Sequence, residues 1–207
     1  MKTLLLCTSF FVICHIAAAQ EIGVGLKGGL NFPNTDALAY ADGIDISDAK
    51  NASGYHVGAF AKIKLAKIAI QPELLYSFQR LEYDLTNGLG TFDVEQEITY
   101  LTVPVMLRYY LVAGLNLQVG PQFGFNLDSK QTDRISGAPT TTDIKDNLKG
   151  ADLSLGLGAG IDLPFGLDLH GRYVLGLTDV NDLEGSSTER NSVIQISIAY
   201  SFFGVGG

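Results

Sequence analysis

The sequence contains very little cysteine. Its two cysteines, among 207 residues, are Cys7 and Cys14. Both lie in the N-terminal segment 1–19, which has the composition of a signal peptide. The remaining chain, residues 20–207, therefore has no disulfide, no cysteine-ligated metal and no cysteine nucleophile. This excludes a small extracellular module held together by disulfides.

Long apolar runs and basic residues are also scarce. Although 46% of the residues are hydrophobic, no run of about 18 apolar residues, as a transmembrane helix needs, follows the N-terminal segment. The chain has 14 Lys and Arg against 22 Asp and Glu, a formal net charge of −8. This balance argues against a nucleic-acid partner, because nucleic acids attract basic surfaces.

The N-terminal segment itself follows the order of a secretory signal. Lys2 provides the positive start, residues 4–13 form a short apolar core, and the alanines at 17–19 resemble a cleavage site. The core is too short to span a bilayer comfortably as an uncleaved anchor. We therefore expect a signal peptide over residues 1–19 and one domain over 20–207.

Eight segments of the remaining chain alternate between large apolar residues and glycine, amide, hydroxyl or charged residues. They cover residues 22–31, 55–65, 68–79, 101–109, 116–125, 153–161, 167–177 and 194–202. Period-two alternation over about ten residues is typical of tilted membrane-spanning strands. The glycine-rich polar face suits the narrow interior of an eight-stranded barrel, and the apolar face suits lipid. The pattern predicts an all-β fold: a monomeric, eight-stranded, antiparallel, up-and-down transmembrane β-barrel. A soluble lipocalin-like carrier also has eight strands, but it would point its apolar residues inward.

The connections between these segments alternate in length. Short turns are expected around residues 66–67, 112–114 and 164–166, and long loops over 32–53, 84–96, 128–150 and 179–191. Short turns at one rim and long loops at the other are the pattern of outer-membrane barrels. We therefore expect a protein of the cell outer membrane, with the loops outside the cell and three of them acidic. Its expected partners are outer-membrane lipid and, through the loops, extracellular or envelope proteins.

Several short motifs resemble the PorT-type outer-membrane β-barrel family of Bacteroidetes-like bacteria, which is related in architecture to small OmpX/OmpA-like barrels. The motifs are Gly28-Gly29-Leu30-Asn31, Gln71-Pro72-Glu73-Leu74-Leu75-Tyr76-Ser77, Tyr100-Leu101-Thr102-Val103-Pro104, Arg108-Tyr109-Tyr110, Gly120-Pro121, Arg172-Tyr173 and Gly176-Leu177-Thr178-Asp179. The resemblance implies the fold and the location. It implies little about activity, although the family's namesake is linked to protein secretion.

Four charged residues are predicted to meet inside the barrel. Counted from the short-turn rim, Lys27, Glu73, Arg108 and Arg172 lie at similar heights, with their side chains inward. Charges in so narrow a space must be paired. We expect a structural ion cluster that plugs the lumen, with Glu73 in direct contact with Arg108 on the neighbouring strand. A selectivity constriction in a pore is the alternative, although eight strands leave little room for one.

Few residues suggest catalysis or metal binding. The histidines after the signal segment, His56 and His170, both point inward, and neither faces lipid as the His/Ser pair of small barrel lipid hydrolases does. The acidic stretches 42–45 and 179–182 have oxygen ligands suited to Ca²⁺ but lack the spacing of a defined calcium loop. We expect a non-enzymatic surface protein with no catalytic residue, metal site or cofactor. A narrow or gated porin-like channel and a secretion-accessory protein are the alternatives.

Overall fold

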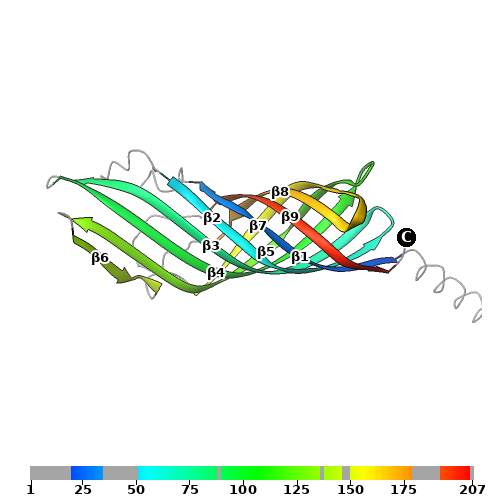
Figure 1. The fold of residues 1–207 in the computed structure, drawn as a ribbon, viewed down its shortest axis with the longest axis horizontal. Helices are drawn as coiled ribbons and strands as arrows, with labels where there is room; N and C mark the ends of the chain where they lie inside the picture. The colour runs from blue at the N-terminus through cyan, green and yellow to red at the C-terminus, as the bar shows by residue number, and fades with distance from the viewer. Residues whose placement is uncertain are drawn as a thin grey trace, which may run out of the picture.

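A computed structural model shows one closed antiparallel β-barrel (Figure 1). It describes residues 20–34, 51–87, 90–135, 138–145, 150–178 and 192–205. The strands are β1 (Gln20–Asn34), β2 (Asn51–Leu65), β3 (Ile68–Asn87), β4 (Gly90–Tyr110), β5 (Leu115–Ile135), β6 (Ala138–Asp143), β7 (Ala151–Asp162), β8 (Leu167–Gly176) and β9 (Ser192–Val205), with a 3₁₀ turn, η3 (Pro164–Gly166), between β7 and β8. Each strand of the ring pairs with its neighbours, and β1 closes on β9; β6 alone stands outside, paired with β5. The prediction of an eight-stranded barrel is confirmed.

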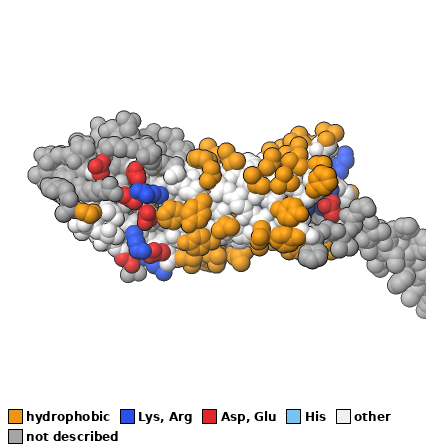
Figure 2. Space-filling view, in the orientation of Figure 1, with side chains coloured by type: hydrophobic (Ala, Val, Ile, Leu, Met, Phe, Trp, Pro, Cys, Tyr) orange, Lys and Arg blue, Asp and Glu red, His pale blue; other side chains and the backbone are white. Residues whose placement is uncertain are grey.

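Burial alternates along each strand as the sequence predicts. On β5, Leu117 and Phe123 are 52% and 44% exposed, whereas Asn116 and Gln118 are 0% and 3% exposed. Exposed apolar side chains form a belt around the middle of the molecule (Figure 2). Such a belt is unfavourable in water but favourable in lipid, where ring closure also satisfies the backbone hydrogen bonds. The apolar residues point outward, which contradicts a lipocalin-like carrier.

Charged pairs mark the two edges of this belt. Lys64 Nζ lies 3.0 Å from a carboxylate oxygen of Glu21 near the short turns. At the other edge, Lys130 Nζ lies 2.8 Å from Asp128, and both side chains are about half exposed. Between these edges, the outward residues of β5 run from Leu115 to Leu127, which is enough for a tilted strand to cross the hydrocarbon core of a bilayer.

The short turns lie where the sequence predicts them, at one end of the barrel, here called the short-turn rim. Each contains a non-glycine residue in the left-handed region: Ala66 at φ 53°, Ala113 at φ 51° and Phe165 at φ 66°. In the second and third turns a glycine with φ near 80° follows directly. The tight reversals between β2 and β3, β4 and β5, and β7 and β8 therefore depend on residues with positive φ.

Two of the predicted long loops are largely strands, so those loop boundaries are wrong. Residues 84–87 of β3 pair with 90–93 of β4, and β5 continues to Ile135 before folding back through β6. Together these extensions form a wing beyond the level of the register partners Arg80, Glu97 and Lys130 (Figure 1). The wing mixes many Thr, Gln, Asp and Glu residues with a few large apolar ones such as Leu85, Phe92 and Val94, and this mostly polar composition resembles that of loops. Backbone pairing nevertheless continues past the apolar belt, because each added residue extends an existing ladder.

Other predictions fall outside the described residues. These are the signal peptide over 1–19, most of the first and last long loops, and the acidic stretches 42–45 and 179–182. In the described residues, no helix is long and apolar enough to cross a membrane.

Candidate functional site: the barrel lumen

Glycines on β7 make room for long polar side chains inside the barrel. A Cβ at Gly156 would lie 3.2 Å from the Arg172 side chain, and a Cβ at Gly160 would lie 2.7 Å from Gln118 Nε2. The inward glycines therefore hold the space that these longer side chains occupy. The lumen is consequently filled by side chains, as an eight-stranded barrel allows.

A buried ion cluster crosses the middle of the lumen. Glu73 on β3 accepts hydrogen bonds from Lys27 Nζ on β1 at 2.9 and 3.1 Å. It also accepts from Arg172 on β8, with Nη2 at 2.9 Å and Nη1 at 3.2 Å. All three residues are 3% exposed or less. We call these three residues the central triad.

The central triad ties together strands that are not neighbours in the sheet. β3, β1 and β8 are separated by other strands in the ring, so Glu73 reaches across the lumen to both cations. An amide oxygen helps to stabilise the surplus positive charge, since Arg172 Nη2 also donates to Gln118 Oε1 at 3.3 Å. A buried carboxylate with two guanidinium bonds and an ammonium is strongly held, because losing one partner leaves another charge unpaired.

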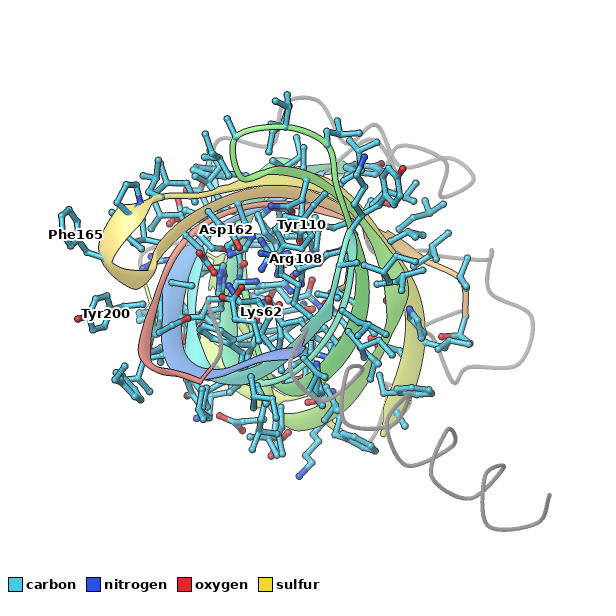
Figure 3. All side chains as sticks on the ribbon, turned by 90° about the vertical axis from the view of Figure 1, so that its right-hand side faces the viewer. Lys62, Arg108, Tyr110, Asp162, Phe165 and Tyr200 are labelled. Carbon is cyan, nitrogen blue, oxygen red and sulfur yellow. The ribbon has the colours of Figure 1, made fainter. Side chains whose placement is uncertain are left out.

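Arg108 belongs to a second cluster, closer to the short-turn rim. We call it the rim cluster: Lys62, Arg108, Tyr110, Asp162 and Asp168. Figure 3 looks onto this rim and shows Lys62, Arg108, Tyr110 and Asp162 inside the ring of strands, with Phe165 and Tyr200 outside it.

Asp162 is the main acceptor of the rim cluster. It takes hydrogen bonds from the Arg108 guanidinium, from Lys62 Nζ at 3.0 Å and from the Tyr110 hydroxyl at 2.8 Å. Asp168 lies 3.4 Å from Lys62 Nζ and 3.6 Å from Arg108 Nη1. Two acids thus face two cations at the rim.

The structure brings together three of the four predicted residues of the ion cluster, and the expected Glu73–Arg108 contact is not formed. Arg108 lies opposite Ala69 in the β3–β4 register, four residues nearer the rim than Glu73. Strands of a barrel are tilted and staggered, so equal counts from a rim do not give equal heights. Gln71 links the two clusters: Arg108 Nη1 donates to its Oε1 at 2.6 Å, and its Nε2 donates to Glu73 at 2.9 Å.

Sequence reasoning missed the acids of the rim cluster. Asp168 alternates with apolar Leu167 and Leu169, so its inward position could be read from the sequence, but its partner Lys62 is on a distant strand. Asp162 lies at the end of β7, just before the turn at Pro164, where alternation gives little information. Both assignments need the register between strands.

A hydrogen-bonded relay surrounds His56 toward the wing. Its Nδ1 lies 2.8 Å from Asn31 Oδ1, and its Nε2 lies 2.8 Å from Ser197 Oγ. Asn31 Nδ2 donates to Ser77 and to two carbonyls, so Oδ1 is the acceptor and His56 Nδ1 the donor. A serine, a base and an orienting group in this order occur in hydrolases. Here all three residues are 3% exposed or less, so a substrate carbonyl has no path to Ser197, and the relay packs the lumen.

His170 is likewise an interior histidine. Its ring Nδ1 accepts from Gln118 Nε2 at 2.7 Å, and the residue is 3% exposed. Its Nε2 is buried with no hydrogen-bond partner in the described part of the chain. The arrangement therefore lacks the nucleophile next to the base that catalysis requires.

The lumen contains a small cavity in its wing half, at the level of Tyr100, Gln122 and Asp152. Its volume is about 20 Å³, room for roughly one water molecule. The lining residues are Gln79, Tyr100, Thr102, Gln122, Asp152, Ser154, Val174, Gly176, Thr178 and Val193. In the described ranges, no three His, Cys, Asp or Glu side chains are grouped to hold a metal ion.

Three solved structures align over most of this chain. Neisserial surface protein A is similar with a TM-score of 0.45 at 8% identity, covering 89% of this chain and 97% of that chain. Ail, the attachment invasion locus protein of Yersinia pestis, gives 0.47 at 12% identity, covering 88% and 98%. The outer membrane protease OmpT of Escherichia coli gives 0.38 at 10% identity, covering 88% and 95%.

A sequence profile described as outer membrane protein beta-barrel domain matches residues 18–182. Among curated proteins, no sequence matches this chain.

Proposed function

Because the chain belongs to the outer membrane protein beta-barrel domain family and is a protein of the cell outer membrane, we propose that it is a non-enzymatic surface anchor with a closed lumen. In this proposal the wing and the long loops lie outside the cell, and the short turns face the periplasm. The barrel then holds an interaction surface at the membrane without conducting solutes. Its partners are outer-membrane lipid around the belt and extracellular or envelope proteins at the wing and loops.

The two ion clusters are the main support for the proposal that the lumen is closed. The central triad and the rim cluster lie one above the other and are linked through Gln71. Their cations are at most 4% exposed. Moving one of these side chains to open a path would leave a charge unpaired in a poorly hydrated space, at a cost of several kcal/mol. A permanent plug therefore fits the packing better than a gate.

The experiment is single-channel recording of the purified protein in planar lipid bilayers. We expect no stable open channel from the wild type. The double variant Arg108→Ala/Arg172→Ala removes one long cation from each cluster and serves as the matched control, because it should conduct once inserted. Reproducible porin-sized openings of the wild type would contradict the proposal. Brief, small openings under voltage would favour the narrow or gated channel instead.

The resemblance to the PorT-type family supports a second candidate, an accessory role in protein secretion. It rests on motifs such as Gln71-Pro72-Glu73, which here supply the central carboxylate and its linking amide. Deleting the gene and comparing the proteins that the bacterium secretes would test it, and unchanged secretion would exclude it. The same cells allow N-terminal sequencing of the protein, which the proposed cleavage of residues 1–19 predicts to begin at Gln20.

A further inference from the structure

Asp152, which is partly buried, differs from the other acids that point into the lumen. Glu73, Asp162 and Asp168 each lie within 4.0 Å of at least one lysine or arginine nitrogen. For Asp152, no such ion pair is formed with any residue in the described ranges. An isolated carboxylate inside a barrel is costly unless a cation or several hydrogen bonds accompany it.

The position of the Asp152 carboxylate is fixed by its neighbour on β5. Gly124 lies directly opposite Asp152 in the β5–β7 register, and its backbone N–H donates a hydrogen bond to the carboxylate. A Cβ at Gly124 would lie 2.3 Å from Asp152 Oδ1, a distance that real Cβ atoms do not adopt. The glycine therefore leaves the space in which the carboxylate is held against the strand.

Several side chains with oxygen atoms line the cavity beside this carboxylate, together with the apolar Val174 and Val193. Gln122 is 7% exposed, lines the cavity and has an Oε1 with no hydrogen-bond partner among the described residues. Thr102, Ser154 and Thr178 add hydroxyl groups. The lining contains no lysine, arginine or histidine. A carboxylate and a buried unpaired carbonyl thus face a space of about 20 Å³ with no cation from the protein.

We propose that this cavity binds one Ca²⁺ ion through oxygen atoms of Asp152, Gln122 and the neighbouring hydroxyls. Calcium takes carboxylate, amide and water oxygens in flexible geometry, whereas Mg²⁺ requires a near-ideal octahedron. Ca²⁺ affinity falls as the number of charged ligands decreases, so one carboxylate gives a weak site of the millimolar kind found in extracellular modules. Access from outside the cell rests on the proposed orientation, but the site itself does not.

The first test is the unfolding temperature of the purified barrel in detergent after treatment with a chelator. A site with a Kd of about 1 mM, given about 10 mM CaCl₂, shifts the unfolding equilibrium roughly tenfold toward the folded protein. We expect this shift with CaCl₂ but not with MgCl₂ or with NaCl at matched ionic strength. The variant Asp152→Asn should lose it, while Asp128→Asn, at the exposed edge of the belt, should keep it.

The second test uses Tyr100 as an optical reporter. Tyr100 lines the same cavity and the chain has no tryptophan, so a Tb³⁺ ion bound there should show luminescence on tyrosine excitation. We expect CaCl₂ to displace this signal and Tyr100→Phe to abolish it while leaving the calcium-dependent unfolding shift intact. A signal that survives Tyr100→Phe would locate the ion elsewhere in the chain and overturn the proposal.

A third variant covers the case in which Asp152→Asn does not fold. Gln122→Met keeps the shape of the side chain but removes the carbonyl oxygen, and it should weaken Ca²⁺ binding severalfold in a folded barrel. If Asp152→Asn folds, calcium shifts equal to the wild-type shift in both Asp152→Asn and Gln122→Met would overturn the site. If Asp152→Asn fails to fold, a wild-type calcium shift in Gln122→Met would overturn it. Neither result depends on conductance or secretion, so the calcium site and the proposed function can fail separately.

Discussion

The two halves of the lumen satisfy their polar groups in different ways. In the half nearest the short turns, Glu73, Asp162 and Asp168 each contact cationic side chains. In the wing half, Asn31, His56 and their neighbours form an uncharged hydrogen-bonded relay, and Asp152 lies beside a small cavity. The same eight strands thus enclose a tightly paired plug and a looser polar vestibule.

The difference indicates which half closes the barrel. Paired charges in a narrow space are hard to rearrange, because each movement exposes an unpaired partner. Neutral amides and hydroxyls can exchange protein partners for water at little cost. Closure is therefore expected in the short-turn half and hydration in the wing half.

Breaking the central triad should have the largest effect on stability. Glu73→Ala leaves Lys27 and Arg172 buried without their carboxylate, and losing one partner of a buried pair typically costs about 3–5 kcal/mol. The measurement is the urea midpoint of the refolded barrel. The control, Asp128→Ala, removes an exposed partner of Lys130 and should cost no more than about 1 kcal/mol.

A triple replacement sharpens the same test. Lys27→Met, Glu73→Leu and Arg172→Met together remove the whole triad and leave none of its charges behind, so the triple variant should be more stable than Glu73→Ala alone. If Glu73→Ala unfolds at the wild-type midpoint, the carboxylate is not buried between two cations.

A smaller effect is expected at the rim. Asp162→Asn weakens bonds from Arg108, Lys62 and Tyr110, but Asp168 remains within reach of both cations. Charge-assisted hydrogen bonds are worth about 1.5–3 kcal/mol, so the loss should fall in that range and below that of Glu73→Ala. Urea unfolding of the two variants in the same lipid provides the comparison. A larger loss at Asp162 would make the rim cluster the main plug.

The smallest expected effect on stability comes from the close approach of β2 and β3 at Gly58. A Cβ at Gly58 would lie 2.0 Å from the Leu74 carbonyl oxygen, whereas a Cβ at the outward Gly171 would have no atom within 4 Å. Gly58→Ala should therefore push β2 from β3 and cost about 1–3 kcal/mol, as overpacking does. Gly171→Ala is the control and should change the midpoint little. Similar midpoints for both variants would contradict the close approach of the two strands.

Strand positions and side-chain directions could be predicted from the sequence because alternation is a local property. The inward positions of Lys27, His56 and Arg172 follow from counting along one strand. Contacts across the lumen could not be predicted in the same way, because they depend on the stagger between strands. This is why counting along the strands predicts a contact between Arg108 and Glu73, although Arg108 contacts Asp162. The wing was missed for another reason: its polar composition resembles that of a loop.

The most direct test of the two-part lumen is chemical access to cysteines placed in each half. Residues 20–207 contain no cysteine, so Thr178→Cys in the wing half and Ala199→Cys beside Lys27 and Asp168 each introduce a single thiol. The folded barrel is treated in lipid with a small, charged, thiol-specific reagent, and the reaction rates are compared with those in urea. Thr178→Cys, at a partly exposed position beside the cavity, should react in the folded protein, and Ala199→Cys, at a position that is 1% exposed, should react only after unfolding. Equally fast reaction of both thiols in the folded barrel would show that the short-turn half is open and would contradict the closed lumen.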